Sequence, residues 1–326
     1  MVNKIKNISI QNLFSSRNID WDLNDVNVLV GKNGLGKSTI LQLIQSTLTQ
    51  EPNDSLTLCD KVDLEFQDGS TTFSSSKFEI DENLFKESFQ KFIESESFEK
   101  QLMSSILNNT NKKISKKEKE AIKNKIFSTV IENKNSKIKV KQYQFKEHEK
   151  KFHVEFISTI NMSANSINKI QTSDGRVANF LDLEIQSELN RLIKNDSTDL
   201  QDKLIHSLNK IFSETNKKVY IINDELVIKL SDERKIAYKN LSSGERQVIY
   251  IFLKVINANI NNSIILMDEP EISLHLSWQE SLLTSIREVN KDSQIIIVTH
   301  SPAIVMNGWM DSFIDIKDIF VEKNRD

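Results

Sequence analysis

The sequence predicts an α/β fold in which a mainly parallel β-sheet is covered by helices on both faces. Two short, wholly apolar runs, residues 264–267 and 295–298, each follow a helical segment. A third apolar run, residues 26–30, leads directly into a glycine-rich loop and a helix. Strands that are apolar on both faces occur in sheets buried on both sides. Alternation of such strands with helices is typical of a parallel sheet.

The composition is that of a globular protein with a large core. The chain has 326 residues, of which 38% are hydrophobic and 27% charged, and its formal net charge of −3 gives no global reason to expect nucleic acid. Its one cysteine, Cys59, cannot form an intramolecular disulfide, and the N-terminus lacks the apolar core of a signal peptide. No run approaches the ~20 apolar residues that span a bilayer. We therefore expect a cytoplasmic protein without direct membrane insertion.

Residues 1–80 predict an N-terminal lobe. Apolar and polar residues alternate over residues 5–10, a turn-like segment follows, and the strand at residues 26–30 feeds the glycine-rich loop. Apolar residues at helical spacing then cover residues 40–48. Residues 61–80 predict a β-hairpin that turns at an Asp-Gly pair.

Residues 81–215 predict a mostly helical insert with strands that return the chain to the core. Lys, Glu, Ser and Asn dominate residues 81–134, with phenylalanines at helical spacing. Lysines at residues 112–119 alternate with glutamates, which favours a solvated face over a phosphate-binding one. Strand-like segments occupy residues 139–160, and residues 181–212 predict one or two amphipathic helices.

Residues 216–326 predict a C-terminal lobe. A second hairpin covers residues 219–230 and turns at an Asn-Asp pair. A helix is expected from Gly244 onward and another over residues 278–289, each followed by one of the two apolar runs. We see no internal repeat.

The most specific motif is Gly-Lys-Asn-Gly-Leu-Gly-Lys-Ser at residues 31–38, which matches GxxxxGK[ST] between a strand and a helix. The glycines let successive backbone N–H groups surround a phosphate, and the helix N-terminus adds a positive dipole. Lys37 would bridge the β and γ oxygens of ATP, and the Ser38 hydroxyl would bind Mg²⁺. The predicted nucleotide-binding residues of this P-loop are Gly31, Lys32, Asn33, Gly34, Leu35, Gly36, Lys37, Ser38 and Thr39.

Two carboxylates follow the apolar run at residues 264–267. Acidic residues often cap buried strands, but together with a phosphate loop they indicate a metal partner and a base. Asp268 would hold Mg²⁺ through water, and Glu269 would orient and polarise the attacking water.

The segment Leu-Ser-Ser-Gly-Glu-Arg-Gln at residues 241–247 resembles the LSGGQ signature of ABC ATPases. Ser243 is expected to cap a helix whose N–H groups face outward at Gly244, which gives a second anion site; an ordinary helix cap is the alternative. The resemblance implies that Ser243 and Gly244 meet the γ-phosphate bound by another copy, so that ATP is sandwiched in a homodimer. It also makes His300, just beyond the run at residues 295–298, the switch histidine. The implied catalytic residues are Lys37, Glu269 and His300.

Further details resemble one branch of the ABC ATPases. Asp-Glu-Pro-Glu-Ile-Ser-Leu-His at residues 268–275 is similar to the form found in the RecF, SMC and OLD families, and residues 299–316 resemble ATPase subunits of the Septu and PARIS antiphage systems. This implies an ABC ATPase head with an antiparallel β lobe and a helical insert, which acts as a sensor or scaffold in antiphage defence. Only a short segment follows His300, so we expect the effector, such as a nuclease, to be a separate protein.

Two alternatives and two departures stay open. A RecF-like ATPase that binds DNA is the second function, and a nucleotide-binding subunit of a transporter is the third. The sequence has no clear Q-loop glutamine, so Thr159 or Asn161 is expected in that role. Phe14 is the aromatic candidate for stacking on adenine.

Overall fold

The computed structural model describes residues 4–76, 90–91, 144–145, 152–159, 169–171, 177–261 and 263–321. The chain divides into two compact units, residues 1–76 with 143–326 and residues 77–142. The predicted helical insert at residues 81–134 lies outside the described residues except for Gln90 and Lys91. The division into segments 1–80, 81–215 and 216–326 stays a prediction.

The predicted parallel sheet is confirmed. Its strand order is β15 (Phe313–Asp315), β3 (Val26–Val30), β14 (Ile295–Thr299), β13 (Ile264–Asp268) and β7 (Val154–Ser158), and each neighbouring pair is parallel. The register pairs Asp268 with Val298 and Thr299 with Val30, so the carboxyl ends of the three central strands lie side by side. In open α/β sheets ligands bind at this edge.

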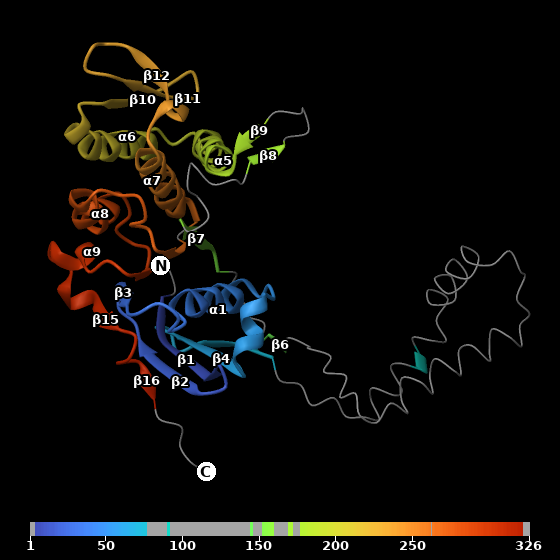
Figure 1. Ribbon diagram of the computed structural model, residues 1–326. Coiled ribbons are helices and arrows are strands. Elements are labelled where there is room, and N and C mark those ends of the chain that lie inside the picture. The colour runs from blue at the N-terminus through green and yellow to red at the C-terminus, as the bar shows by residue number, and fades with distance from the viewer. Residues whose placement is uncertain are drawn as a thin grey trace, which may run out of the picture. The chain divides into compact units, whose positions relative to one another are not determined.

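Each face of the parallel sheet carries its own hydrophobic core. On β13, Ile264 and Leu266 pack into one core while Ile265 and Met267 pack into the other, as the period of two along a strand requires. The first core includes α1 (Lys37–Thr49) and an antiparallel sheet. The second includes the helices α5 (Phe180–Lys194), α6 (Thr198–Phe212), α7 (Ser243–Asn261) and α8 (Leu276–Val289). Figure 1 shows α1 beside β1 and β4.

The antiparallel sheet has the order β16 (Phe320–Val321), β2 (Arg17–Asp22), β1 (Ile5–Leu13), β4 (Lys61–Phe66), β5 (Thr71–Ser75) and β6 (Gln144–Phe145). The predicted hairpin is confirmed by the pairing of β4 with β5. Strand β2 was not predicted, because Arg17, Asn18, Asp20 and Asp22 mask the alternation. Its apolar residues, Ile19 and Trp21, are buried.

The predicted helical region at residues 181–212 consists of two helices, α5 and α6. The Ser197 side chain accepts a hydrogen bond from the Leu200 N–H and caps α6, and the preceding Asp196 has a left-handed φ of 50° that ends the first helix. A short helix, α9 (Ala303–Met306), follows the parallel sheet. Single-turn 3₁₀ helices lie at η1 (Asp54–Leu58), η2 (Ser213–Thr215), η3 (Tyr238–Asn240) and η4 (Met310–Ser312).

The second predicted hairpin is also confirmed. Strands β10 (Lys218–Ile222), β11 (Glu225–Lys229) and β12 (Lys235–Ala237) form a three-stranded antiparallel sheet beside α6 (Figure 1). A further antiparallel pair joins β8 (Lys169–Gln171) to β9 (Val177–Asn179). Among the helices that the structure describes, none is long and apolar enough to cross a membrane.

A buried group of charges fastens β7 to α5 and α7. Lys254 on α7 donates to Glu155 on β7 at 3.2 Å and to Glu188 on α5 at 3.0 Å, and Arg191 pairs with both carboxylates. Loss of one partner from a buried ion pair strongly destabilises a protein, because the other charge is left unpaired. The group therefore favours one position of β7 against α5 and α7. Strand β7 ends at Ser158, directly before Thr159 of the site described next.

Candidate functional site

The phosphate loop joins β3 to α1 as the sequence predicts. Gly36, with a φ of 98°, is the N-cap of α1, and this left-handed conformation favours glycine. A Cβ atom at Gly31 would lie 2.5 Å from Cγ2 of Ile316, so that position also excludes a side chain. Lys32, Asn33 and Gly34 at the tip of the loop are exposed. The loop therefore presents its backbone to solvent where a phosphate would bind.

Lys37 is buried beneath this loop. Its Nζ donates to the carbonyl oxygens of Gly31 at 2.8 Å and Lys32 at 3.2 Å, and it lies 3.1 Å from Nε2 of His300. Burial lowers the pKa of Lys37, and the charges of Glu269, Asp268 and Glu271 oppose that effect. The ammonium group is thus held at the loop by backbone oxygens that a phosphate can replace.

Ser38 and Asp268, the two residues expected to bind Mg²⁺, lie side by side. The Ser38 Oγ at the start of α1 donates to Oδ1 of Asp268 at the end of β13, over 2.8 Å. Asp268 is 2% exposed, and burial raises its pKa despite the hydrogen bond from Ser38. Mg²⁺ prefers oxygen ligands and is commonly bound by one or two protein groups together with phosphate oxygens and water. A hydroxyl and a buried carboxylate within hydrogen-bond distance fit that requirement.

Glu269 and His300 are brought together across the ends of β13 and β14. His300 Nε2 lies 3.0 Å from Oε1 of Glu269, and both side chains are partly exposed. Glu269 has a φ of 50°, and its N–H donates to the Val298 carbonyl at 2.9 Å. A left-handed φ at a glutamate is uncommon, and such positions cluster at functional sites. His300 therefore stands between Lys37 and Glu269.

Two residues next to the carboxylates have roles that the sequence did not reveal fully. The Thr159 hydroxyl donates to the Glu269 carbonyl, and the Thr159 N–H donates to the Asp268 carbonyl at 3.3 Å. Thr159 thus lies at the site, whereas Asn161, the other candidate for the Q-loop position, lies outside the described residues. Glu271 is buried against the backbone that carries His300. Its place in the Asp-Glu-Pro-Glu segment was the available signal.

The signature segment corrects one expectation. Ser242, rather than Ser243, caps α7: the Glu245 N–H donates to the Ser242 hydroxyl at 3.3 Å, and the Ser242 N–H donates to the Glu245 carboxylate at 3.0 Å. This reciprocal capping box requires a glutamate three residues after the cap, which the sequence supplies only for Ser242. Ser243 is the first residue of α7. A Cβ atom at Gly244 would lie 2.4 Å from the Ser273 carbonyl oxygen, so α7 begins tightly against the loop that follows Glu269.

Phe14 borders the phosphate loop. A Cβ atom at Gly36 would lie 2.6 Å from Cε2 of the Phe14 ring, and the Phe14 N–H donates to the Leu58 carbonyl at 2.7 Å. The side chain is 37% exposed. The ring therefore lies beside the loop, and its contact with adenine stays a prediction.

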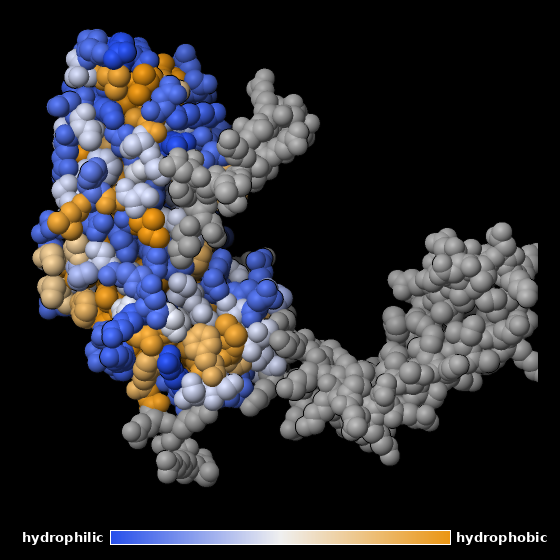
Figure 2. All heavy atoms as spheres, viewed as in Figure 1, coloured by the Kyte–Doolittle hydropathy of each residue, from blue (hydrophilic) through white to orange (hydrophobic). Residues whose placement is uncertain are grey.

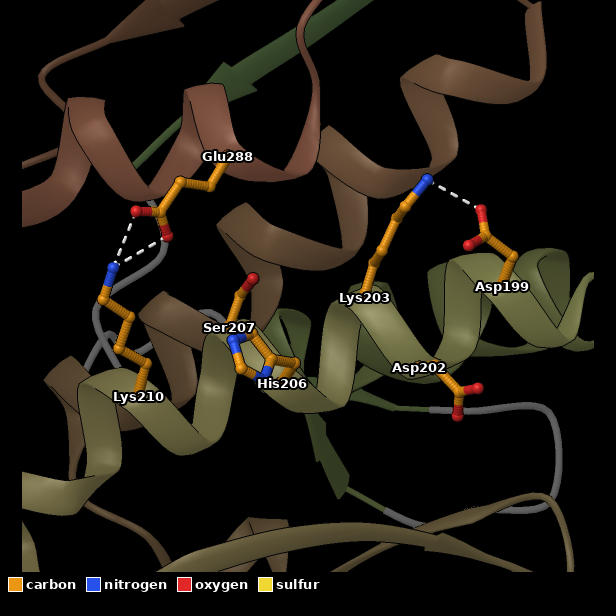
Figure 3. Close-up of a pocket in the computed structure, with 7 residues that line it drawn as sticks. All are labelled: Asp199, Asp202, Lys203, His206, Ser207, Lys210 and Glu288. Carbon is orange, nitrogen blue, oxygen red and sulfur yellow. Dashed lines mark hydrogen bonds and ion pairs between the residues drawn. The ribbon is translucent and has the colours of Figure 1, made fainter.

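A separate surface depression of about 540 Å³ lies between α6 and α8 (Figure 3). Its lysines are paired with carboxylates, Lys203 with Asp199 at 2.7 Å and Lys210 with Glu288 at 2.7 Å. None of the residues that line it belongs to the motifs above. Among the described residues, the predicted site residues therefore lie at the ends of the parallel strands and not in this depression.

The phosphate loop between β3 and α1, the parallel sheet and the carboxylates that end β13 are the fold and motifs of a P-loop ATPase. Residues 26–307 match the family described as "AAA domain, putative AbiEii toxin, Type IV TA system", and the chain belongs to that family. The predicted resemblance to ATPases of antiphage systems is confirmed by three relatives from retron and Septu systems, described next.

Three named relatives are similar to parts or most of the chain. The Retron Vc95 probable ATPase of Vibrio cholerae serotype O1 biovar El Tor is 24% identical, over 93% of this chain and 71% of that protein. The Retron Ec83 probable ATPase of Escherichia coli is 25% identical, over 42% of this chain and 30% of that protein. The Septu protein PtuA of Bacillus thuringiensis is 28% identical, over 46% of this chain and 41% of that protein. The chain thus matches less than half the length of the last two.

Solved structures similar to the chain include two SMC heads. The SMC head domain from Thermotoga maritima is 14% identical, with 93% of this chain and 92% of that chain covered and a TM-score of 0.48. The SmcHead bound to the C-winged helix domain of ScpA is 12% identical, with 93% and 91% covered and a TM-score of 0.47.

Proposed function

We propose that the protein binds Mg-ATP between two copies of itself, hydrolyses it to ADP and phosphate, and serves as the ATPase of an antiphage system with a separate effector. One observation carries the hydrolytic part. Lys37, His300 and Glu269 form a continuous series of contacts of 3.0–3.1 Å, beside the Ser38–Asp268 pair. Residues at the start of α1 and at the carboxyl ends of β13 and β14 would thus supply a cation, a metal pair and a base at one sheet edge.

Each side chain has a task that its environment suits. The phosphate-loop backbone and Lys37 bind the β- and γ-phosphates. Ser38 and Asp268 would hold Mg²⁺, which would supply neutralisation of charge on the phosphate oxygens. Glu269 orients a water and takes its proton as the water oxygen bonds to the γ-phosphorus and the bond to ADP breaks. His300, between Glu269 and Lys37, fixes the base and contacts the transferred phosphoryl group. Positioning and electrostatics carry most of this chemistry.

The second copy would complete the site through the start of α7. Free N–H groups at a helix N-terminus bind anions, and Ser243 and Gly244 occupy the first two positions of α7. Ser242 is exposed and Ser243 half-buried, whereas Gly244 is buried, so a partner would reach this end of the helix through Ser242 and Ser243. The support for a sandwiched dimer is this placement together with the resemblance of the segment to the ABC signature.

The defence role rests on the relatives named for retron and Septu systems. A test would express the chain and its neighbouring genes in a bacterial host and measure phage plaquing with the parent and with Lys37→Ala. We expect protection with the parent only, and co-purification of an effector with tagged protein. Equal plaquing on cells with and without the intact operon would contradict the defence role while leaving the ATPase assay unaffected.

DNA binding by a RecF-like ATPase is the second candidate, and a row of lysines favours it. The strand register places Lys218 opposite Lys229 and Lys229 opposite Lys235, across all three strands of the β10–β11–β12 sheet. Like charges directly opposite each other destabilise a sheet, so the row costs stability. Tyr220, 37% exposed, alternates along β10 with the buried Val219 and so projects on the same face as Lys218. In Figure 2 hydrophilic residues surround a small hydrophobic group in this part of the molecule.

Lysines beside an exposed aromatic ring suit the phosphates and a base of single-stranded nucleic acid. The opposing feature is Glu233, which pairs with Lys229. Anisotropy of a labelled single-stranded DNA, titrated with salt, tests this candidate. Replacing the three lysines by alanine should reduce the salt slope by about 2 if each contacts one phosphate. Lys203→Ala, on α6, is the control, and an unchanged slope in the triple variant would rule the face out.

A further inference from the structure

The carboxylate of Glu271 holds the backbone segment that carries His300. Its Oε1 accepts hydrogen bonds from the Thr299 hydroxyl at 2.5 Å, from the His300 N–H at 3.1 Å and from the Ser301 N–H at 3.3 Å. Glu271 is 7% exposed. It lies two residues after the base Glu269, so one short loop carries both the base and the acceptor for the neighbouring strand end.

We propose that Glu271 is a positioning residue that sets His300 between Glu269 and Lys37 for ATP hydrolysis, an inference that rests on the proposed function. Strand β14 ends at Thr299, and the N–H groups that follow are satisfied by side chains. The His300 N–H donates to Glu271, and the Ser301 N–H is shared between Glu271 and the Thr299 hydroxyl, the latter at 2.9 Å. A carboxylate can accept several such donors at once, and bonds to a charged acceptor are stronger than neutral ones. The His300 ring then keeps its contacts of 3.0 Å with Glu269 and 3.1 Å with Lys37.

A second set of bonds restrains the same segment from its other side. The Ser301 hydroxyl donates to Oε1 of Gln279 at 2.7 Å, and Nε2 of Gln279 donates to the Leu274 carbonyl at 2.9 Å. Leu274 belongs to the loop that starts with Glu269, and its side chain approaches the position of Gly244 at the start of α7. These contacts therefore connect the His300 segment and the loop after β13 to the start of α7.

The second carboxylate oxygen of Glu271 takes no part in these bonds. Among the residues that the structure describes, Oε2 has no hydrogen-bond partner although it is buried. An unpaired buried oxygen is unfavourable. A glutamine at this position keeps an oxygen acceptor for the three donors and places its amide group where Oε2 now lies. Glu271→Gln is therefore the matched variant that separates the acceptor from the charge.

The experiment measures steady-state ATP hydrolysis and Mg-ATP binding by the full chain carrying Glu271→Ala or Glu271→Gln. We expect Glu271→Ala to lower kcat by about tenfold or more with ATP affinity within about threefold of the parent, because Lys37, Ser38 and Asp268 lie on other elements. Glu271→Gln should stay within about threefold of the parent kcat. Glu288→Ala, a carboxylate on α8 outside the site, should change neither value.

The double variant decides whether Glu271 acts through His300. In a His300→Ala background, Glu271→Ala should cause no further loss of kcat, since residues that act as a unit are not additive. Additive losses, or a parental kcat in Glu271→Ala, would overturn the proposal. If Glu271→Ala does not fold, Thr299→Val is subjected to the same cycle with His300→Ala. This variant changes shape little and removes the hydroxyl that donates to Glu271 and accepts from the Ser301 N–H. A parent protein that does not hydrolyse ATP would instead contradict the proposed function.

Discussion

Replacement of Glu269 by glutamine separates chemistry from nucleotide binding. In the parent, Oε1 of Glu269 lies 3.0 Å from Nε2 of His300. Glutamine keeps the length of the side chain and an oxygen within reach of His300, but removes the carboxylate that accepts a proton. General-base catalysis contributes about 10²–10⁴-fold to a rate. This corresponds to roughly 3–5 kcal/mol of transition-state stabilisation. We therefore expect kcat to fall by at least about 10²-fold.

Binding of Mg-ATP should survive this replacement. The contacts of Lys37 with Gly31 and Lys32, and the bond from Ser38 to Asp268, do not involve the Glu269 side chain. Without hydrolysis the γ-phosphate stays intact, and a dimer closed over it through α7 should accumulate. ATP, and not ADP, should then shift the variant to a larger species in light scattering coupled to size-exclusion chromatography.

Two controls make the result interpretable. Glu288→Gln changes a carboxylate to an amide on α8, outside the site, and should hydrolyse ATP at the parental rate. If the dimer is already constitutive, the mass cannot change, and protection of residues 242–244 from hydrogen exchange by ATP replaces it as the readout. A Glu269→Gln variant with parental turnover would refute the assignment of Glu269 as the base.

Three further variants test the remaining parts of the site. Lys37→Ala should abolish ATP binding in isothermal titration, because it removes the cation held at the phosphate loop; unchanged affinity would contradict the site. Ser243→Arg should leave ATP binding and thermal unfolding near parental values while preventing hydrolysis, and turnover at the parental rate would argue against a site completed by α7. Asp268→Asn should raise the Tm of the nucleotide-free protein at pH 7. Burial raises the pKa of Asp268, so the folded protein loses stability as pH rises through that pKa and the carboxylate becomes charged. Asparagine stays neutral at every pH and avoids this loss. The gain should shrink in acid and be accompanied by loss of Mg²⁺-dependent turnover; a gain that is the same at every pH would refute the electrostatic explanation.

Much of the fold was predictable because the signals were local. The phosphate loop, both hairpins and the apolar strands β13 and β14 each combine a periodic pattern with turn residues that need a special backbone conformation. Asn223 and Asp224, with φ values of 50° and 65°, illustrate this at the second hairpin. Strand β2 escaped prediction because four of its six residues are polar, and its pairing with β1 and β16 makes it a strand.

The site was predictable in its motifs and less so in its connections. The structure brings together Lys37, Ser38, Asp268, Glu269 and His300, each of which follows a recognisable strand or loop. Their roles stay a prediction. The contacts of Thr159 and Glu271 join segments more than 25 residues apart in the chain, 110 residues in the first case and 28–30 in the second. No local pattern encodes such a contact. The cap of α7 was misassigned to Ser243 although Glu245 stands three residues after Ser242, which is the spacing that a capping box requires.

The loop that follows β13 connects the proposed hydrolytic residues to the start of α7, which is the proposed contact with the second copy. The loop begins with Glu269, the proposed base, and continues through Glu271, which accepts a hydrogen bond from the His300 N–H. It then reaches Ser273, whose carbonyl lies against Gly244. Close packing leaves little room for one of these groups to move without the others, since interiors are dense and transmit strain. A change at the γ-phosphate that moves His300 would therefore also displace residues at the start of α7. Since α7 is the part proposed to touch the second copy, loss of the γ-phosphate has a direct route to dimer opening, and Glu271 is the residue whose replacement should interrupt it.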